Sequence, residues 1–311
     1  MRPNIFRKQN RKGKHLKKRK FRKDTMQKLK AFLALTKPSI MLLVVITGAT
    51  ALIMEGSLLQ EPMRFFMAIL AIYLTGGSAN ALNQCFERDI DAKMKRTAAR
   101  RPLPMNSIGA VPAFAFSIGI GLAGLAIFYF MFNAYSALLS LATILFYSLF
   151  YTLYLKPNTE QNIVIGGIAG SMAPVGAWVA ATGHMAVEPW VLFLIIFLWT
   201  PPHFWALALV YKDDYRVANL PMMPNVKGDD HTFKQILVYT WLLVIASLAL
   251  VINEQFNVVY ALLALALGGV YLQKTYKVMK VREVRQLKGL FGYSIIYLFG
   301  LFAVIVVDSI V

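Results

Sequence analysis

The chain has 311 residues, of which 58% are hydrophobic and 15% charged, and its formal net charge is +18. Its mean hydropathy is +0.55, and its apolar content exceeds the roughly 45–50% of soluble globular domains. This composition excludes an ordinary soluble domain and indicates a protein that crosses a membrane several times.

Nine stretches of the chain are long and apolar enough to span a bilayer, for which a helix needs roughly 20 residues. Gly, Pro, Ser or Asn residues interrupt several of them, which is typical of helices packed on one another around an interior. We therefore predict an all-α polytopic membrane protein. The predicted spans are 39–58, 63–85, 108–131, 134–155, 162–182, 189–211, 234–253, 255–273 and 290–311.

The positions of Lys and Arg support this count, because basic residues concentrate in cytoplasmic loops. If the N-terminus is inside, every Lys and Arg except Arg64 falls in an inside segment. A miscounted span would scatter the basic residues over both sides. We therefore predict an integral, multi-pass protein of a bacterial cell membrane, with a cytoplasmic N-terminus and an outside C-terminus. The inside segments are 1–38, 86–107, 156–161, 212–234 and 274–289.

The first 30 residues differ from the rest in being strongly basic. Segment 7–23 contains one aliphatic residue, Leu16, and its composition predicts disorder. We interpret 1–30 as a cytoplasmic tail that contacts anionic lipid, and 31–311 as the membrane domain. Because the positive charge lies on one membrane face, we expect the lipid bilayer and no nucleic acid as a partner.

Cysteine and histidine residues limit the metal chemistry that is available. Cys85 is the single cysteine, which excludes an internal disulfide and a multi-Cys metal site. The four His residues are spread along the chain without a metal-binding spacing. His203 lies in a predicted span, where an ionisable residue is a functional candidate. A His that is hydrogen-bonded to a neighbouring helix fits the sequence equally well.

A row of oxygen ligands stands at the end of the second span. Asn83, Glu87 and Asp91 are each four residues apart, so they share one face of a helix. Oxygen ligands without thiolate or imidazole suit Mg²⁺, which typically pairs one or two carboxylates with substrate phosphates. The spacing alone fits equally well a solvated helix end with local ion pairs.

Basic residues follow this row and include Arg96 and Arg101, which could hold a diphosphate that a metal bridges to the carboxylates. A second acidic element, Asp213 and Asp214, closes the sixth span on the same side of the membrane. Lys156 lies at that side as well. We predict that these segments converge at one mouth of the helical bundle.

These residues resemble a known family. The row of Asn83, Glu87 and Asp91, followed by "KRTAARRPLP" (95–104), resembles the first signature of the UbiA superfamily of intramembrane prenyltransferases, N-x-x-x-D-x-x-x-D and then R-T-x-x-R-P-L. Glu87 and three further segments resemble the branch of that superfamily that farnesylates haem. Those segments are "NIVIGGIAGSMAPVGAW" (162–178), "WTPPHFWAL" (199–207) and "DYRVANLPMMP" (214–224).

The resemblance implies nine transmembrane helices around a central cavity with cytoplasmic cap loops, 86–107 and 212–234. It implies transfer of a farnesyl group from farnesyl diphosphate to a vinyl group of haem b, which gives haem O and diphosphate. The product would serve haem-copper oxidase assembly, so a haem A synthase or a terminal oxidase assembly factor would be a partner.

The resemblance also implies roles for individual residues. Developing charge on the diphosphate leaving group must be stabilised, so a metal ion and Lys or Arg side chains supply the main catalytic effect. The implied catalytic residues are Asn83, Glu87, Asp91 and Asp214, which with Asp213 are also the implied Mg²⁺ ligands. The implied diphosphate-binding residues are Arg96, Arg101 and Lys156, and His203 is the candidate for binding the acceptor.

Two other functions remain open on the sequence. A prenyltransferase of the quinone or chlorophyll type would use another aromatic acceptor, and segment 199–224 argues against it. That type carries a second D-x-x-x-D motif, whereas Val210 and Ala218 flank Asp214 at four residues. A transporter that relays cations would need acidic residues within its spans, but the acidic candidates lie at the cytoplasmic boundary.

Overall fold

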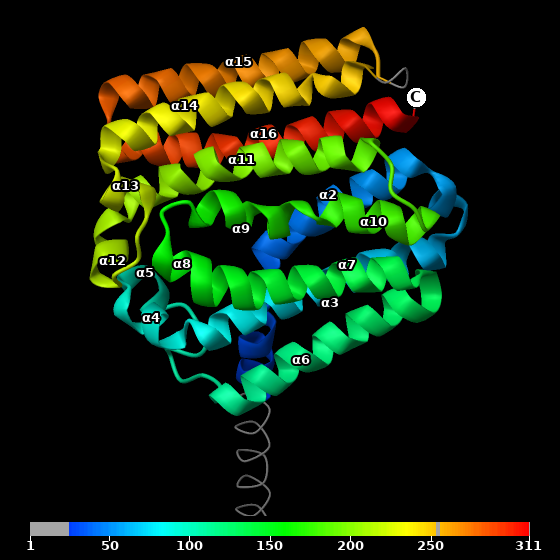
Figure 1. Ribbon diagram of the computed structural model, residues 1–311, viewed down its shortest axis with the longest axis horizontal. Helices are drawn as coiled ribbons and strands as arrows, with labels where there is room; N and C mark the ends of the chain where they lie inside the picture. Colours follow the sequence, from blue (N-terminus) through cyan, green and yellow to red (C-terminus); the bar gives the residue numbers. More distant parts are fainter. Residues whose placement is uncertain (1–24, 253–255, 311) are drawn as a thin grey trace, which may run out of the picture.

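The computed structural model describes residues 25–252 and 256–310 (Figure 1). Residues 25–35 form a helix that precedes the first span. Residues 25–30 of the predicted tail belong to this helix. Segment 7–23, for which the composition predicts disorder, lies outside the described residues.

All regular structure in the described residues is helical, and nine helices there are long and apolar enough to cross a membrane, as predicted. These spans are α2 (Pro38–Glu55), α3 (Pro62–Phe86), α6 (Ala110–Ile127) with the π-helix η2 (Phe128–Phe132), α7 (Ala134–Leu145) with the π-helix η3 (Phe146–Leu155) and α8 (Lys156–Asn158), α9 (Asn162–Ser171) with α10 (Ala173–Thr182), α11 (Glu188–Val210), α14 (Gly228–Ser247), α15 (Val258–Val281) and α16 (Val284–Ile310).

The last three helices are longer than the apolar pattern predicts. Helix α14 begins at Gly228 rather than 234, α15 continues to Val281 rather than 273, and α16 begins at Val284 rather than 290. Charged residues interrupt the apolar pattern at these ends but not the backbone hydrogen bonding of a helix. The helices therefore extend beyond the apolar stretch, and two residues connect α15 to α16.

The helix ends are set by local backbone chemistry. Gly56 and Gly183 follow α2 and α10 in the left-handed conformation, with φ of 88° and 77°, which glycine adopts at little cost. At the start of α15 the Asn257 side chain accepts hydrogen bonds from the backbone N–H groups of Val259 and Tyr260. These caps reverse the chain and make successive spans antiparallel.

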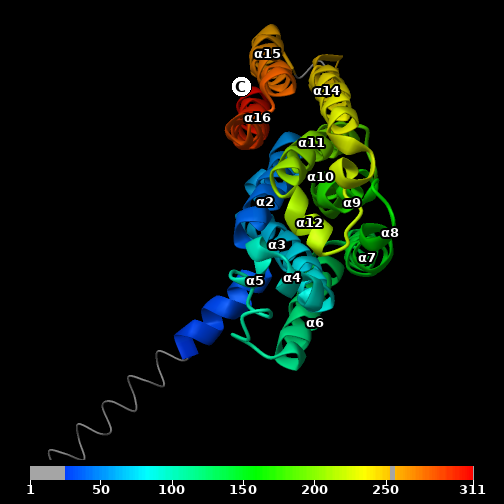
Figure 2. The same cartoon turned by 90° about the vertical axis from the view of Figure 1, so that its left-hand side faces the viewer.

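The helices lie side by side along one general direction (Figure 1). Helix α3 packs on α2, α6 and η3, while α11 packs on α9, α14 and α16. The last helix, α16, also packs on α2, so the two ends of the helical series are neighbours (Figure 2). The chain therefore closes into a ring of helices.

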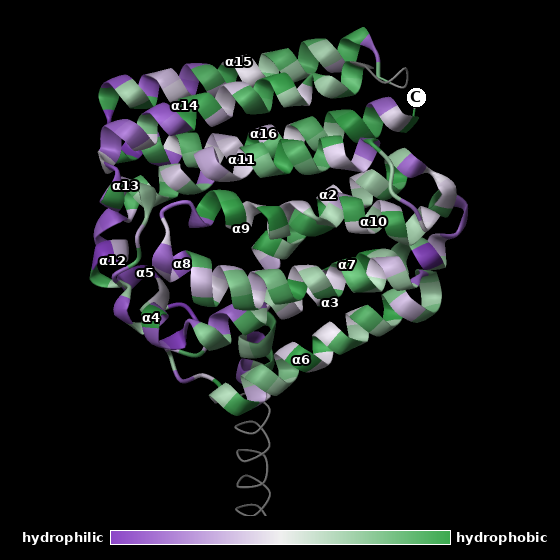
Figure 3. Cartoon of the chain, viewed as in Figure 1, coloured by the Kyte–Doolittle hydropathy of each residue, from purple (hydrophilic) through white to green (hydrophobic). Residues whose placement is uncertain are grey.

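Hydropathy divides the helical bundle into a broad apolar part and a polar end (Figure 3). Large apolar side chains on the helix faces are exposed, among them Val111, Phe130 and Leu262. Exposed apolar surface of this extent suits contact with lipid. Hydrophilic residues gather at the end of the bundle that carries α4, α5, α12 and α13.

Four short helices form the predicted caps at this polar end. Helices α4 (Arg88–Lys93) and α5 (Lys95–Ala98) connect α3 to α6, and α12 (Lys212–Val217) and α13 (Met223–Val226) connect α11 to α14. The two caps meet, because the backbone N–H of Arg96 donates to Asp214 Oδ2 over 3.0 Å. The second cap ends at residue 227 rather than 234, since α14 begins earlier than predicted.

Candidate active site

A buried charged cluster lies where α3 meets the first cap. Glu87 and Asp91 are 1% and 0% exposed. Lys156 Nζ lies 2.5 Å from Glu87 Oε1, and Arg101 Nη1 lies 3.4 Å from Glu87 Oε2. Arg101 also forms an ion pair with Asp91. The cluster therefore joins the end of α3, the first cap and the end of the fourth span.

Asn83, Glu87 and Asp91 lie on one helical face, although α3 ends at Phe86 and α4 begins at Arg88. The backbone N–H of Glu87 donates to the Asn83 carbonyl over 3.0 Å, and that of Asp91 donates to the Glu87 carbonyl over 2.8 Å. Helical i to i+4 bonding thus continues through the junction. The Asn83 amide then donates to Thr152 Oγ1 over 3.0 Å, which ties the row to the fourth span.

Lys37, directly before the first span, also belongs to this cluster. Its Nζ donates to Asn83 Oδ1 over 2.9 Å. Its backbone is left-handed, with φ of 52°, directly before Pro38, and such strain costs of order 1 kcal/mol and gathers at functional sites. Burial, helped by the positive charge of Arg101, lowers the pKa of Lys37 to about 7. In the sequence, Lys37 cannot be distinguished from an ordinary basic residue at a cytoplasmic helix end.

The cluster has more cationic than anionic groups, since Lys37, Arg101 and Lys156 face two carboxylates. Burial opposes ionisation of Glu87, but Lys156 and Arg101 together hold its pKa below the usual value. Burial raises the pKa of Asp91 despite the charge of Arg101. A buried site with an excess of cations favours a multiply charged anionic ligand.

The residues present suit a magnesium ion only together with a ligand that brings oxygens of its own. Asp91 Oδ1 is buried and has no hydrogen-bond partner among the described residues, so one carboxylate oxygen is available. Asn83 and Glu87 provide further oxygens of the type that Mg²⁺ binds. Within residues 25–252 and 256–310, however, no three His, Cys, Asp or Glu side chains lie together as a complete metal site.

Arg96 connects the first cap to the second. Its guanidinium lies over the Tyr211 ring, 5.3 Å from the centroid, and its Nη2 is 3.4 Å from the Tyr215 hydroxyl. Its Nε is buried and has no hydrogen-bond partner in the described part of the chain. Arg96 therefore has a free N–H donor at the junction of the caps.

The two adjacent aspartates of the second cap have different environments. Asp214 accepts from the backbone of Arg96, as described above. The Asp213 side chain is 90% exposed and pairs with Arg216 at 3.2 Å. Because successive helical residues point about 100° apart, both side chains cannot face the first cap. The structure brings Asp214 to the junction of the caps but not Asp213.

His203 lies at a helix interface, apart from the charged cluster. Its ring stacks between Trp199 and Phe291, with centroid distances of 4.2 Å and 4.4 Å. Its Nδ1 is 2.6 Å from Ser294 Oγ on α16. Of the two interpretations that the sequence allows, these contacts match a histidine that is hydrogen-bonded to a neighbouring helix. No contact joins His203 to the other predicted site residues among those described.

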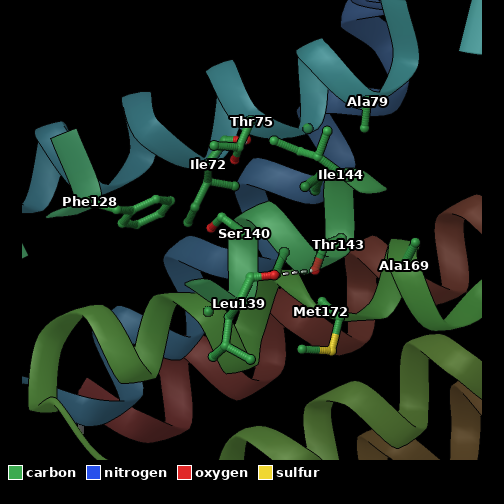
Figure 4. Close-up of a pocket in the computed structure, with 14 residues that line it drawn as sticks. Ile72, Thr75, Ala79, Phe128, Leu139, Ser140, Thr143, Ile144, Ala169 and Met172 are labelled. Carbon is green, nitrogen blue, oxygen red and sulfur yellow. Dashed lines mark hydrogen bonds between the residues drawn. The ribbon is translucent and has the colours of Figure 1, made fainter. Parts of the chain in front are cut away.

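An apolar pocket occupies the interior beyond the charged cluster (Figure 4). It holds about 70 Å³ of space for water-sized molecules and is partly open to its surroundings. Ile72, Gly76 and Ala79 of α3 line it. They lie on the same helical face as Asn83, which follows Ala79 by four residues. The pocket and the charged cluster therefore share one face of α3.

Tyr147 and Tyr151 lie between the pocket and the cluster on the π-helix η3. Their rings stack, with centroids 5.0 Å apart and planes 18° apart. Tyr147 packs against the apolar cluster of Ala79, Leu82 and Ile144, and Tyr151 packs against Gly166 of α9. A Cβ at Gly166 would overlap the Tyr151 ring, so this packing requires glycine. The apolar pattern of the fourth span does not reveal that these two side chains face inward.

Solved structures support this fold. A digeranylgeranylglyceryl phosphate synthase structure matches with a TM-score of 0.74 at 18% identity, over 91% of this chain and 99% of that one. A UbiA homologue from Archaeoglobus fulgidus, solved with GPP and Mg²⁺ bound, matches with a TM-score of 0.60 at 17% identity, over 88% of this chain and 99% of that one. At these identities the likeness establishes the fold.

Sequence comparison establishes the family. A protoheme IX farnesyltransferase of Erythrobacter litoralis is 45% identical over 282 residues, which cover 89% of this chain and 91% of that protein. The model of the UbiA prenyltransferase family matches residues 42–304, which include the charged cluster from Asn83 to Lys156 and Asp214. This match spans most of the chain, and the protein is therefore a member of the UbiA prenyltransferase family.

Proposed function

We propose that this protein transfers the farnesyl group of farnesyl diphosphate to a vinyl group of protoheme IX, haem b. The observation that carries the proposal is the buried, cation-rich cluster at the polar end of an apolar pocket, in a chain whose relatives at 45% identity are protoheme IX farnesyltransferases. An isoprenoid diphosphate has the same division into a charged head and an apolar tail.

In this proposal the C1–O bond of farnesyl diphosphate breaks, and C1 bonds to the terminal vinyl carbon of the haem. Water supplies the hydroxyl group of the resulting hydroxyethylfarnesyl substituent, and diphosphate leaves. Arg101 and Lys156 bind the diphosphate oxygens, with Arg96 donating from the junction of the caps. Lys37, which donates to Asn83 Oδ1, adds positive charge when it is protonated. Cations aimed at the leaving group lower the barrier to its departure.

Magnesium is the metal that we propose for this site. Asn83, Glu87 and Asp91 would hold it, with Asp214 contributing from the second cap, and its oxygen-rich surroundings support this choice. The ion supplies positive charge where the diphosphate develops negative charge. The A. fulgidus homologue bound to GPP and Mg²⁺ supports the same ligand chemistry. Because of its exposure, Asp213 is not included among the proposed ligands.

The apolar pocket has a separate role in the proposed reaction. Its lining comes mainly from aliphatic and aromatic side chains, which hold the isoprenoid tail and keep water from the allylic cation until the vinyl group has reacted. The stacked Tyr147 and Tyr151 rings, which lie near Glu87, would contact the isoprenoid close to its charged head.

We further propose that the polar end faces the cytoplasm of a bacterial cell, which places the N-terminus inside and the C-terminus outside. Substrates then enter from the inner leaflet and the cytoplasm. The product haem O would pass to haem-copper oxidase assembly, so a haem A synthase or an oxidase assembly factor is the proposed partner.

A transporter is less well supported. The acids within the described spans lie at helix ends, such as Glu55, Glu188 and Asp308, and none lies at the middle of a span. A cation relay needs acidic groups at the middle of the membrane. A quinone-type prenyltransferase would have the same fold. However, the relatives at 40–45% identity, which align with about nine-tenths of this chain, are named protoheme IX farnesyltransferases.

Mass analysis of haems tests the proposed function directly. Membranes that contain this protein, haem b and farnesyl diphosphate should accumulate haem O, whereas membranes without the protein should not. The mass of the product identifies both the acceptor and the prenyl group. A prenylated quinone with unmodified haem would contradict the proposal.

Replacing Arg101 with Ala should weaken binding of farnesyl diphosphate by about 10- to 100-fold, because charge-assisted hydrogen bonds to phosphate are lost. Haem binding should change little. The matched control is Arg100→Ala, since Arg100 is the adjacent residue and is exposed. Equal losses for both substrates in equilibrium binding measurements would count against the diphosphate role of Arg101.

A further inference from the structure

We propose that Phe128 closes the inner end of the apolar pocket and thereby sets the isoprenoid chain at three units. This inference rests on the proposed transfer of a prenyl group from a diphosphate donor. It assigns the choice of chain length to one side chain on the sixth turn of the third span, far from the charged cluster.

In the aromatic segment Phe128–Phe132, Phe128 faces inward, whereas the other side chains face outward or lie at the edge of the bundle. It is 1% exposed, whereas Tyr129 and Phe130 are 58% and 82% exposed. Phe128 begins the π-helix η2, and its ring meets that of Phe132 edge to face at 6.1 Å. It lines the pocket, and Figure 4 shows it on the Ile72 side, opposite Ala79.

The packing of α6 on α3 shows that Phe128 lies at the end of the pocket remote from the charged cluster. A Cβ at Gly121 would meet the Ser78 side chain, and a Cβ at Gly124 would meet that of Thr75. The two helices are therefore antiparallel and in close contact, and each turn along α6 leads away from Asn83. Phe128 lies one turn beyond Gly124, at the end of the pocket that is remote from the charged cluster.

The distance from the cluster to this end matches a farnesyl chain. Ile72 and Asn83 are eleven residues apart on α3, which corresponds to about 16 Å at 1.5 Å per residue. An extended chain advances about 1.2 Å per bond, so the eleven bonds along three isoprene units span about 13 Å. A fourth unit adds four bonds and about 5 Å, which would carry the chain beyond Ile72 and into the Phe128 ring.

Close packing around Phe128 prevents its ring from moving aside for a longer isoprenoid chain. Phe128 belongs to the closely packed apolar core together with Ile72, so its ring has little room to move aside. In an apolar site, a difference of one small group typically changes specificity by about 10- to 200-fold. A whole isoprene unit that does not fit should therefore be rejected by at least that factor.

Competition between donors of different length tests the inference. The purified protein in lipid is given haem b with equal amounts of geranyl, farnesyl and geranylgeranyl diphosphate, and the products are separated by mass. The wild type should make the farnesyl product. Phe128→Ala should raise the ratio of geranylgeranyl to farnesyl product by about 10-fold or more. Phe130→Ala, at an exposed position two residues away, should leave that ratio unchanged.

Two further variants and a binding assay keep the inference falsifiable. Phe128→Leu retains an apolar side chain and should give a smaller shift toward the longer donor, while Phe128→Trp should shift the preference toward geranyl diphosphate. Binding of the three diphosphates without haem tests the pocket even if the acceptor is not haem. A chain-length preference that is the same in wild type and in all three Phe128 variants overturns the inference. If the protein does not modify haem but the Phe128 variants still bind the three diphosphates with an altered preference, the proposed acceptor is contradicted and the role of Phe128 is not.

Discussion

Replacing Asp91 with Asn is expected to lower magnesium-dependent farnesyl transfer by at least about 100-fold, the usual effect of removing one group that stabilises transition-state charge. The substitution keeps the shape of the side chain but removes a carboxylate whose Oδ1 has no hydrogen-bond partner in the described part of the chain. Initial rates at increasing Mg²⁺ concentration measure the effect, since a metal ligand should change the magnesium dependence as well as the maximum rate.

Asp89→Asn provides the matched control for this experiment. Asp89 lies two residues before Asp91 on the same short helix, but its side chain is 84% exposed and pairs with Arg88. Its substitution should leave both the rate and the magnesium dependence unchanged. Membrane insertion should be normal in both variants. Unaltered turnover of Asp91→Asn would remove Asp91 from the metal role.

Replacing Glu87 with Gln should abolish activity and also destabilise the protein, because Lys156 and Arg101 would lose their shared carboxylate in a buried cluster. Removing one partner of a buried ion pair typically costs about 3–5 kcal/mol. The temperature of unfolding in detergent should therefore fall. Added inorganic diphosphate should raise this temperature more in Glu87→Gln than in the wild type, since the anion compensates the excess positive charge.

The exposed Asp213 serves as the control for Glu87. Asp213→Asn removes a carboxylate of the second cap whose side chain is 90% exposed, so it should change neither the unfolding temperature nor the response to diphosphate. Equal unfolding temperatures for Glu87→Gln and the wild type would show that Glu87 does not compensate the buried cations, and would contradict the proposed charge balance of the site.

Fold class and span number follow from the sequence because the bilayer imposes one simple requirement on every span. A helix of about 20 apolar residues satisfies its backbone hydrogen bonds by itself. The apolar pattern therefore identifies the nine spans without knowledge of their neighbours. The same pattern misplaces the cytoplasmic ends of α14, α15 and α16, because hydropathy marks where apolar residues stop rather than where the helix stops.

The shared face of Asn83, Glu87 and Asp91 also follows from the sequence, since it depends on helical periodicity alone. Their partners do not. Lys37 reaches Asn83 from another helix, and Lys156 reaches Glu87 from 69 residues away. Positive-inside bias places basic residues at all these helix ends, so composition cannot select the ones that enter the cluster.

Only the tertiary structure decides which side chains of a pair or run face the interior. It distinguishes Asp214 from Asp213, places His203 against Ser294 and turns Phe128 inward while Phe130 faces outward. The sequence by itself determines local periodicity, span number and the side on which charge accumulates, because these depend on each segment and the solvent around it. Which helix lies opposite a given residue depends on packing across the whole ring, and that packing determines the site.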